Sequence, residues 1–466
     1  MDHMNKNETY EITIEDFTKD GEGVGHIEGM AVFVKDTVPG DVAVIKIIKL
    51  KKNYAYGRLM EVITPSRYRV EPVCDKARQC GGCIFQHVSY ERQLEFKLKH
   101  VRDCLKRIGG IENADELITG ICGMDEPYHY RNKAQFPVGR DKEGKVITGF
   151  YAGHSHNIID TEKCFIQAKV NEEILACVRK YIEDYNITTY SEEEHKGLVR
   201  HVLTRVGFTT GEIMVCLVIN GKKLPHSEVL VERLKGIEGM TSICLNVNTE
   251  KTNKILGNEC ITLWGEDYIT DYLGDVKFRI SPLSFYQVNP VQTEKLYGKA
   301  LEYAGLTGSE TVWDVYCGIG TISLFLAKKA KHVHGVEIVP EAIEDAELNS
   351  SINDITNTTF YVGKAEEVLP REYEKNGIHA DVIVVDPPRK GCDIKALETI
   401  IKMEPKRIVY VSCDPATLAR DVKWLSENGY ELKCGEAYDQ FCFSGHVETV
   451  VQLVNIGVKP DYTVRL

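Results

Sequence analysis

Apolar and polar residues alternate along the first 63 residues of the chain, and turn-forming residues interrupt the alternation. The alternating segments are YEITIEDF, GMAVFVKD, DVAVIKIIKL and YGRLMEVI. A period of two predicts short strands with one buried face, here four or five of them. Because closure of a sheet removes its unpaired edges, we expect a small β-barrel over residues 1–63.

A helical period replaces the alternation over residues 89–109, where apolar residues recur at spacings of three and four. They form one stripe, made of Leu94, Leu98, Val101, Leu105 and Ile108. Strand-like and helical segments then mix up to residue 280. This mixture predicts a central α+β domain over residues 64–280, whose helix 89–109 can pack on the domain that follows.

From residue 281 onward, strand-like segments alternate with helical ones. The strand candidates are TVWDVYC, HVHGVEI, TTFYVGK, ADVIVVDPP and RIVYVSC. This alternation predicts a parallel sheet with helices on both faces, a Rossmann-like α/β domain over residues 281–466. Three domains agree with a length of 466 residues, which is too long for a single core.

The composition is that of an ordinary globular protein, with 43% apolar and 27% charged residues. No apolar run approaches the ~20 residues of a membrane span. The N-terminal MDHMNKNETY lacks the apolar centre of a signal peptide. We therefore expect a cytoplasmic protein without a membrane partner, and we expect a monomer.

A glycine turn between a strand and a helix, VYCGIGTISL, is a candidate ligand loop. Gly318 and Gly320 would let a ligand approach the backbone closely, although a plain structural turn fits G-x-G as well. Glu337 ends the next strand and could accept both hydroxyls of a ribose. The missing third glycine favours S-adenosylmethionine, which has no pyrophosphate, over NAD. Asp386, which ends a later strand, is placed to face the same site.

Cys413 ends the strand RIVYVSC and should face the same crevice, because ligands bind at the carboxyl ends of parallel strands. A thiolate is a good nucleophile and a good leaving group, which suits reversible addition to C6 of a pyrimidine. Such addition makes C5 nucleophilic toward a methyl sulfonium, and a base must then remove the C5 proton. Glu448 is the candidate base. Without context, core packing of Cys413 and a solvated Glu448 are equally good interpretations.

Three cysteines in CDKARQCGGC, namely Cys74, Cys80 and Cys83, are too close in sequence to be core residues. A tetrahedral metal site or an iron–sulfur cluster needs a fourth thiolate. Cys104 lies on an apolar helical stripe, whereas Cys164 follows a polar loop and is the better ligand. Spacing alone does not choose between zinc and a [4Fe-4S] cluster.

Five motifs together resemble those of the RNA (uracil-5-)-methyltransferases, which make 5-methyluridine in ribosomal and transfer RNA. The match is strongest to the 23S ribosomal RNA branch and covers nearly the whole chain. The motifs are FYQVNP (285–290), DVYCGIGT (314–321), VDPPRKG (385–391), VSCDPATLARD (411–421) and HVETV (446–450). Residues 1–63 resemble the TRAM domain, an OB-like barrel that precedes the class I methyltransferase domain in many members.

The resemblance implies a role for each of the singled-out residues. Cys413 would be the nucleophile and Glu448 the base, with a [4Fe-4S] cluster on Cys74, Cys80, Cys83 and Cys164. The expected contacts with S-adenosylmethionine come from Gln287, Tyr316, Gly318, Glu337 and Asp386. Position 321 departs from some members, since it is Thr here and Asn in them.

A substrate base inside folded RNA must be unstacked, which calls for aromatic and cationic groups. Net charge is −12, so we expect local RNA footprints rather than a basic surface. The candidates are Lys46, Lys51 and Lys52 in the barrel, together with Arg131, Lys133, Phe150 and His154. The predicted substrate is 23S ribosomal RNA, at one uridine or two.

Three alternatives stay open at this point. The substrate could be a uridine of transfer RNA. The enzyme could be an RNA cytosine-5 methyltransferase, although those carry a second cysteine where this chain has Asp386. The protein could also be a non-catalytic iron–sulfur protein that binds RNA.

Overall fold

The structure is a computed structural model that describes residues 4–153 and 155–457, and these form two compact units. The first unit runs up to Lys99 and includes two later segments, Phe150–Ile159 and Phe441–His446. The second unit holds the rest of the chain. One predicted RNA contact, His154, lies outside the described residues.

The first unit begins with a six-stranded sheet whose order is β1-β5-β6-β4-β3-β2. The backbone N–H of Glu15 donates to the carbonyl of Val24 at 2.7 Å, which brings the β1 end of the sheet back to β3. Alternate residues are buried inside it, including Ile12, Val34 and Ile45. The sequence pattern predicted four or five strands, and the two-residue β2 is too short to show a period. The strands are β1 (Thr9–Thr13), β2 (Asp16–Phe17), β3 (Gly23–Ile27), β4 (Met30–Val34), β5 (Val42–Leu50) and β6 (Tyr54–Thr64).

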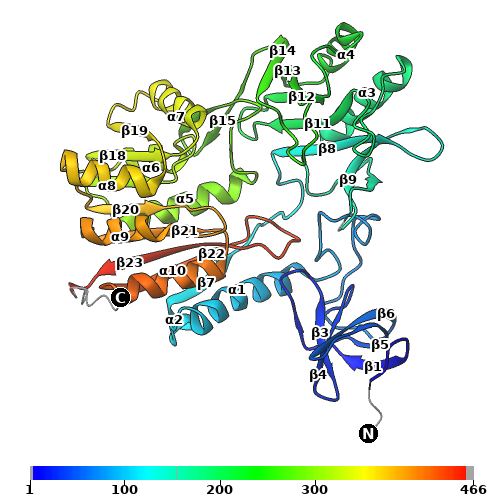
Figure 1. The fold of residues 1–466 in the computed structure, drawn as a ribbon, viewed down its shortest axis with the longest axis horizontal. Helices are drawn as coiled ribbons and strands as arrows, with labels where there is room; N and C mark the ends of the chain where they lie inside the picture. The colour runs from blue at the N-terminus through cyan, green and yellow to red at the C-terminus, as the bar shows by residue number, and fades with distance from the viewer. Residues whose placement is uncertain (1–3, 154, 458–466) are drawn as a thin grey trace. The chain divides into compact units, whose positions relative to one another are not determined.

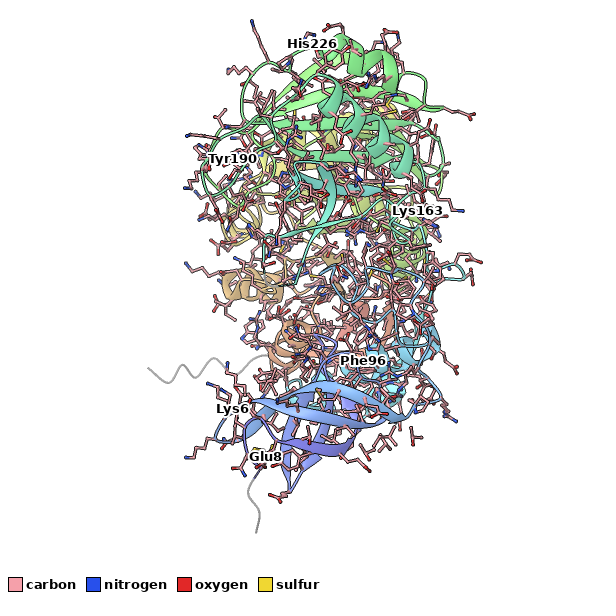
Figure 2. The ribbon with its side chains drawn as sticks, turned by 90° about the vertical axis from the view of Figure 1, so that its right-hand side faces the viewer. Lys6, Glu8, Phe96, Lys163, Tyr190 and His226 are labelled. Carbon is pink, nitrogen blue, oxygen red and sulfur yellow. The ribbon has the colours of Figure 1, made fainter. Side chains whose placement is uncertain are left out.

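The predicted helix is present as α1 (Tyr90–Arg107), but its buried stripe differs from the expected one. Ile108 is 41% exposed, whereas Lys97 is fully buried. The reason is a tertiary hydrogen bond, since Lys97 Nζ donates to the carbonyl oxygen of Phe441 at 3.0 Å. Phe96 on the same helix, labelled in Figure 2, packs edge-on against Phe17, with ring centroids 5.6 Å apart.

The central part of the chain forms a seven-stranded mixed sheet of order β10-β9-β8-β11-β12-β13-β14. Strands β11 and β12 are fully or almost fully buried, which explains their continuous apolar runs. The strands are β8 (Lys133–Arg140), β9 (Val146–Tyr151), β10 (Ile158–Asp160), β11 (Val199–Val206), β12 (Ile213–Ile219), β13 (Met240–Val247) and β14 (Glu259–Gly265). The helices are α2 (Ala114–Leu117), α3 (Asn171–Asp184) and α4 (Ser227–Leu234).

The C-terminal part is an eight-stranded sheet of order β19-β18-β17-β20-β21-β23-β22-β7, in which β17 to β21 are parallel (Figure 1). All five strands expected from the sequence are present. They are β17 (Thr311–Val315), β18 (His332–Glu337), β19 (Thr358–Val362), β20 (Val382–Val385) and β21 (Arg407–Ser412). The antiparallel β22 (Tyr430–Tyr438) and β23 (Glu448–Asn455) and the parallel β7 (Ile118–Cys122) complete the sheet.

Helices connect these strands, and the order of the strands places the ligand crevice. The chain moves outward from β17 to β19 and then returns to β20 beside β17, so the strand order reverses between these two neighbours. Right-handed crossovers then put the two sets of helices on opposite faces, and ligands bind at the reversal. The helices are α5 (Pro290–Ala304), α6 (Thr321–Ala327), α7 (Pro340–Ile352), α8 (Ala365–Asn376), α9 (Ile394–Met403) and α10 (Pro415–Glu427), and a hairpin of β15 (Ile269–Leu273) and β16 (Val276–Ile280) precedes α5.

Candidate active site

Four parallel strands end at the predicted site residues. β17 leads into Tyr316, β18 ends at Glu337, β20 leads into Asp386 and β21 leads into Cys413. Glu448 opens β23, which runs antiparallel to β21 with Ser412 opposite Thr449. Cys413 directly follows Ser412, and Glu448 directly precedes Thr449. The two residues therefore lie at the same end of two paired strands, at the carboxyl edge of the parallel sheet.

The loop after β17 has the backbone of a ligand-binding turn. Tyr316, Gly318 and Gly320 all have positive φ angles, of 73°, 54° and 80°. A tyrosine in this region is strained, and such strain is found mainly at functional sites. The backbone N–H groups of Tyr316 and Cys317 both donate to the carbonyl of Val336 at 3.0 Å, which holds the turn against β18.

The carboxylate of Glu337 is fixed by backbone donors on both sides. Its Oε1 accepts from Ile338 at 2.8 Å and Val339 at 3.0 Å, and its Oε2 accepts from Gly318 at 3.2 Å. A carboxylate oriented in this way is ready to accept hydrogen bonds from the hydroxyls of a ribose.

Gln287 and Thr321 come together at the hydroxyl of Tyr297. The hydroxyl of Tyr297 lies 3.4 Å from Thr321 Oγ1, and the side chain of Gln287 is close enough to act on the pKa of this hydroxyl, which burial raises. Asn289 caps α5 by accepting from Gln292, which fixes the start of the helix next to Gln287. Sequence reasoning missed Tyr297. This residue lies on α5 beyond the end of the FYQVNP motif, and only the fold brings it back to the site.

Two carboxyl groups at this edge have pKa values raised well above the ordinary value of an aspartate. Burial, and secondarily the charge of Asp314, raises the pKa of Asp386 to about 7. Burial raises the pKa of Asp314 to about 7 as well, although Ser323 Oγ donates to its Oδ2 at 2.5 Å. The Oδ1 of Asp314 accepts no hydrogen bond from any described residue. Negative charge is therefore under-compensated here, which suits a cationic ligand.

These features fit S-adenosylmethionine. Nothing stands within 4 Å of the place that a Cβ of Gly318 would occupy, so the backbone is open to a ligand there. Gly318, Glu337 and Asp386 offer an approachable backbone, a ribose acceptor and a carboxylate for a sulfonium. The cofactor interpretation of the sequence is therefore chemically consistent with the fold.

The thiol of Cys413 and the carboxyl of Glu448 share one electrostatic environment. Burial, together with the negative charges of Glu448 and Asp386, raises the pKa of Cys413 to about 12, although the positive charge of Arg389 lowers it. Burial and Asp386 likewise raise the pKa of Glu448 to about 8, against the same arginine. Sequence reasoning missed Arg389, although it directly follows the Pro-Pro pair of VDPPRKG.

Asp414 and Pro415 present Cys413 at the start of a helix. The side chain of Asp414 caps α10 by accepting from the backbone N–H groups of Ala416 and Thr417, both at 3.0 Å. Pro415 occupies the first turn of the helix, where its missing N–H costs nothing. The two residues after the cysteine therefore form a helix cap.

Comparison with known proteins identifies the family. Residues 89–456 match the family described as tRNA (Uracil-5-)-methyltransferase, and residues 4–60 match the TRAM domain. The chain belongs to this methyltransferase family. Full-length relatives agree: an "Uncharacterized RNA methyltransferase" of Clostridium tetani is 52% identical over 457 residues, 98% of each chain. Another, from Halalkalibacterium halodurans, is 52% identical over 451 residues, 97% of this chain and 98% of its own.

A solved structure shows the same fold. The Pyrococcus abyssi tRNA (uracil-54, C5)-methyltransferase, in complex with S-adenosyl-L-homocysteine, superposes with a TM-score of 0.77 at 28% sequence identity. The alignment covers 95% of this chain and 99% of that one. This family therefore uses S-adenosylmethionine and acts on RNA, and the predicted barrel and Rossmann-like domain are confirmed.

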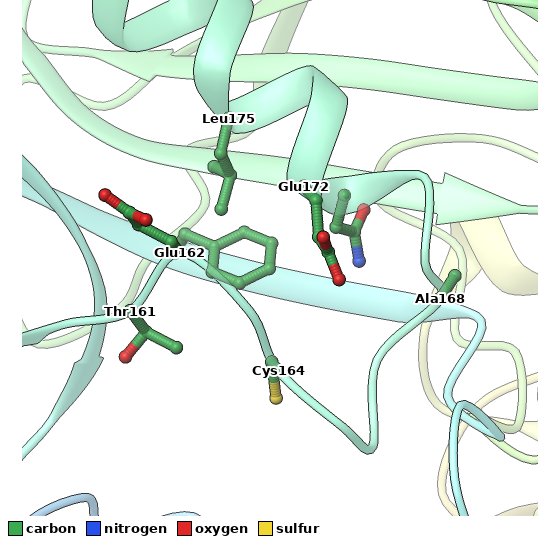
Figure 3. A pocket seen from close by; sticks show the side chains of 8 residues that line it. Thr161, Glu162, Cys164, Ala168, Glu172 and Leu175 are labelled. Atoms are coloured by element: carbon green, nitrogen blue, oxygen red, sulfur yellow. The ribbon is translucent and has the colours of Figure 1, made fainter. Parts of the chain in front are cut away.

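The predicted metal ligands are divided between the units. Cys74, Cys80 and Cys83 are half-buried in the first unit, where the backbone N–H of Gly82 donates to Cys80 Sγ at 3.4 Å. Cys164 belongs to the second unit and lines a small pocket, where its sulfur points away from Glu172 of α3 (Figure 3). Among residues 4–153 and 155–457, no three His, Cys, Asp or Glu side chains are arranged to hold a metal ion.

The RNA-contact candidates occupy different parts of the chain. Lys51 and Lys52 are exposed at the β5–β6 turn of the barrel, and Lys46 on β5 is half-buried. Lys133 pairs with Arg205 across β8 and β11. Burial, then the charges of Arg205 and Arg131, lowers the pKa of Lys133 to about 7. Phe150, the aromatic candidate, lies on β9.

One further property concerns membranes. Within the described residues, no helix combines the length and the apolar character that a membrane-spanning segment requires.

Proposed function

We propose that this chain uses S-adenosylmethionine to methylate C5 of a uridine in 23S ribosomal RNA, at one or two sites. The observation that carries the proposal is the placement of Cys413 and Glu448 on paired neighbouring strands, beside Asp386 and the loop after β17. Family membership supports the chemistry, and the five motifs support the ribosomal branch.

Cys413 has the role of a nucleophile. Its thiolate adds to C6 of a flipped uracil, a C–S bond forms, and the electron pair of the C5–C6 double bond moves toward C5 and the C4 carbonyl. Arg389 favours the thiolate, because its positive charge lowers the pKa of Cys413. The carbon C5 thereby becomes a nucleophile in its own right.

The cofactor residues have a holding role. S-adenosylmethionine supplies an electrophilic methyl group on a positively charged sulfur. Glu337 would accept hydrogen bonds from the ribose hydroxyls, and the backbone of the turn at Gly318 would lie against the ligand. Gln287, Tyr316 and Asp386 would complete the contacts, with the raised pKa of Asp386 relieved by a neighbouring cation.

Glu448 has the role of the base that completes the reaction. Its carboxylate takes the proton from C5, the C5–C6 double bond re-forms, and the sulfur of Cys413 leaves with the electron pair of the C–S bond. A pKa of about 8 makes Glu448 a stronger base than an ordinary carboxylate and still ionisable near neutral pH.

Two substitutions test this mechanism on unmodified 23S ribosomal RNA with radiolabelled methyl donor. Cys413→Ala should abolish methylation and leave cofactor binding near normal, while Cys177→Ala, a half-buried cysteine on α3, serves as the control. Glu448→Gln should accumulate a covalent protein–RNA adduct that survives denaturant, because methylation proceeds and elimination stalls. Full activity of Cys413→Ala would refute the nucleophile, and absence of the adduct would refute the base.

Transfer RNA is the second candidate substrate, because the Pyrococcus abyssi protein is named for position 54 of transfer RNA. Parallel assays on unmodified ribosomal and transfer RNA, followed by mapping of the methylated nucleotide, separate the two. Methyl transfer confined to transfer RNA would overturn the ribosomal assignment and leave the mechanism intact.

We also propose that Cys74, Cys80, Cys83 and Cys164 hold a [4Fe-4S] cluster. Support comes from the cysteine spacing and from the Gly82 N–H that donates to Cys80, since such bonds are common around metal-bound sulfur. Protein purified without oxygen should be brown and contain about four iron atoms, and Cys80→Ser should lose them. A colourless protein with one zinc per chain would replace the cluster by zinc.

The barrel is proposed to hold RNA phosphates. Lys46, Lys51 and Lys52 lie in a stretch, residues 42–58, that contains no acidic residue. Within the same stretch, Tyr54 and Tyr56 pack edge to face with ring centroids 5.7 Å apart, and Tyr54 is 37% exposed. Lysines with partly exposed aromatic rings form the kind of surface that binds unpaired RNA. The proposed contacts in the rest of the chain are Arg131, Lys133 and Phe150.

A further inference from the structure

The loop that carries Asp386 and Arg389 is tied down along its length by one helix. We call residues 386–393 the Pro-Pro loop. Thr417 Oγ1 donates to the carbonyl of Arg389 at 3.2 Å, and Arg420 Nη2 donates to the carbonyl of Lys390 at 2.9 Å. Both donors lie on α10, the helix that begins two residues after Cys413. The nucleophile and the loop beside it are therefore held by the same element.

The centre of this attachment is a buried carboxylate that the mechanism does not use. Asp421 on α10 is 2% exposed, and its Oδ2 accepts both from the backbone N–H of Cys392, at 2.9 Å, and from the hydroxyl of Tyr410, at 2.6 Å. Its Oδ1 accepts from Arg420 Nε at 2.8 Å. Tyr410 lies three residues before Cys413 on β21, so one side chain joins the strand, the loop and the helix.

The fit between the loop and Asp421 leaves no space for adjustment. Gly391 has a φ of 79°, and a Cβ there would stand 2.7 Å from Asp421 Oδ2 and 2.4 Å from Arg420 Nη2. Buried charges are rare unless they are fully hydrogen-bonded, because an unsatisfied one is expensive. A satisfied carboxylate against a glycine that tolerates no side chain is a way to fix a loop in one position.

We propose that Asp421 is a positioning residue that holds the Pro-Pro loop, and with it Arg389, in a fixed place relative to Cys413. This inference rests on the proposed function, because it takes Cys413 as the nucleophile. The charged groups that act on the pKa of the thiol are Glu448 from β23 and Asp386 and Arg389 from the loop.

The substitution Asp421→Asn keeps the size of the side chain and removes its charge. An amide cannot accept on both sides, so its NH2 group meets a donor, either the N–H of Cys392 or the partner Arg420. The loop should then loosen and Arg389 should leave the thiol. Since Arg389 is the group that lowers the pKa of Cys413, formation of the covalent adduct should require a higher pH.

The experiment measures the rate of adduct formation from pH 6 to 10 on 23S ribosomal RNA transcribed with 5-fluorouridine, which has no C5 proton for Glu448 to remove. Asp421→Asn and Arg389→Gln should each move the profile to higher pH, and the rate at a given pH should fall by up to tenfold for each pH unit that the profile moves. The double variant should be no slower than Arg389→Gln alone. Glu427→Gln, an exposed carboxylate at the end of α10, is the matched control.

Several outcomes would overturn the inference. An unchanged profile for Asp421→Asn, a uniform loss of rate at every pH, or additive effects in the double variant would each show that Asp421 has only a structural role. If Asp421→Asn does not fold, Arg420→Met tests the same attachment, because the side chain of Arg420 is 52% exposed and should tolerate replacement. Adduct formation by Cys413→Ala would instead refute the proposed function itself.

Discussion

Asp386→Asn should make the protein more stable at alkaline pH. Asp386 is half-buried, no described residue donates a hydrogen bond to its carboxylate, and burial together with Asp314 raises its pKa to about 7. A carboxyl whose pKa is raised by folding binds its proton more tightly in the folded state. The stability that this proton provides is complete below pH 4 and is lost as the pH rises through 7.

The magnitude follows from the difference between the folded and unfolded pKa of Asp386. The pKa rises from 3.8 to about 7, and each pH unit of that difference corresponds to about 1.4 kcal/mol. By linkage, ionisation of the aspartate lowers the free energy of unfolding by about 1.7 kcal/mol at pH 5 and about 4 kcal/mol at pH 8. Asparagine has no such penalty. Partial solvent access makes these values a ceiling, and we expect a gain of at least about 1 kcal/mol at pH 8.

Urea unfolding between pH 5 and pH 8, without cofactor, measures the effect. The fluorescence of Trp264, Trp313 and Trp424 reports on the second unit, because all three tryptophans of the chain lie there. Asp381→Asn is the matched control. Asp381 precedes β20 at its opposite end, pairs with Lys406 at 3.4 Å and accepts from the backbone of Thr311 at 3.0 Å, so its loss should bring no gain.

Two results would contradict this reasoning. Asp386→Asn could be no more stable than the parent protein at pH 8, or its advantage could be the same at pH 5 and pH 8. Either result would mean that Asp386 is not held in an environment that disfavours its charge. The same variant should lose methylation, since a carboxylate suited to a cationic ligand has been removed, and this loss would make the site a case of activity obtained at the expense of stability.

Three further predictions concern other parts of the chain. The rate of elimination from the Cys413–RNA adduct, measured by quenched flow, should increase as the pH rises through about 8, because Glu448 must be ionised to take the proton. A rate that does not change with pH would exclude Glu448 as the base. Lys97→Met should destabilise the chain by about 1–3 kcal/mol, because the hydrogen bond from the charged Lys97 Nζ to the carbonyl of Phe441 is lost, although Ser444 still donates to that carbonyl. Thermal unfolding checks this against Lys99→Met, a surface position whose change should be near neutral. Replacing both Lys51 and Lys52 by Ala should reduce the slope of log affinity against log salt for RNA by about 1.5 in total; an unchanged slope would remove the barrel from the interface.

The catalytic domain was predictable because its strands carry local signals. β20 and β21 are short, mainly apolar runs, VIVV and RIVYVS, and Asp386 and Cys413 are the residues that follow directly at their carboxyl ends. A single rule about the carboxyl ends of parallel strands was enough to bring them together. Glu448 required more, because β23 is antiparallel to β21 and its position beside Cys413 depends on a pairing between residues far apart in sequence.

The error in the predicted stripe of helix α1 has the opposite cause. The stripe on α1 was inferred from apolar spacing alone, which placed Ile108 inside and Lys97 outside. A lysine can be buried only where a partner satisfies its ammonium, and here the carbonyl of Phe441 lies 344 residues away along the chain. No local pattern contains such a contact.

The same distinction separates the residues of the site from the properties of the site. A sequence motif locates Cys413, but the pKa of its thiol depends on Glu448 at the start of β23 and on Asp386 and Arg389 in the Pro-Pro loop, two segments that only the fold brings to one place. The placement of Arg389 in turn depends on Asp421, the last residue of the motif VSCDPATLARD. That motif therefore contains the nucleophile and, eight residues later, the residue that anchors the Pro-Pro loop. The loop carries Arg389, which lowers the pKa of the nucleophile. Spacing along α10 accounts for this arrangement, because two turns of helix carry the carboxylate from the thiol to the far side of the Pro-Pro loop.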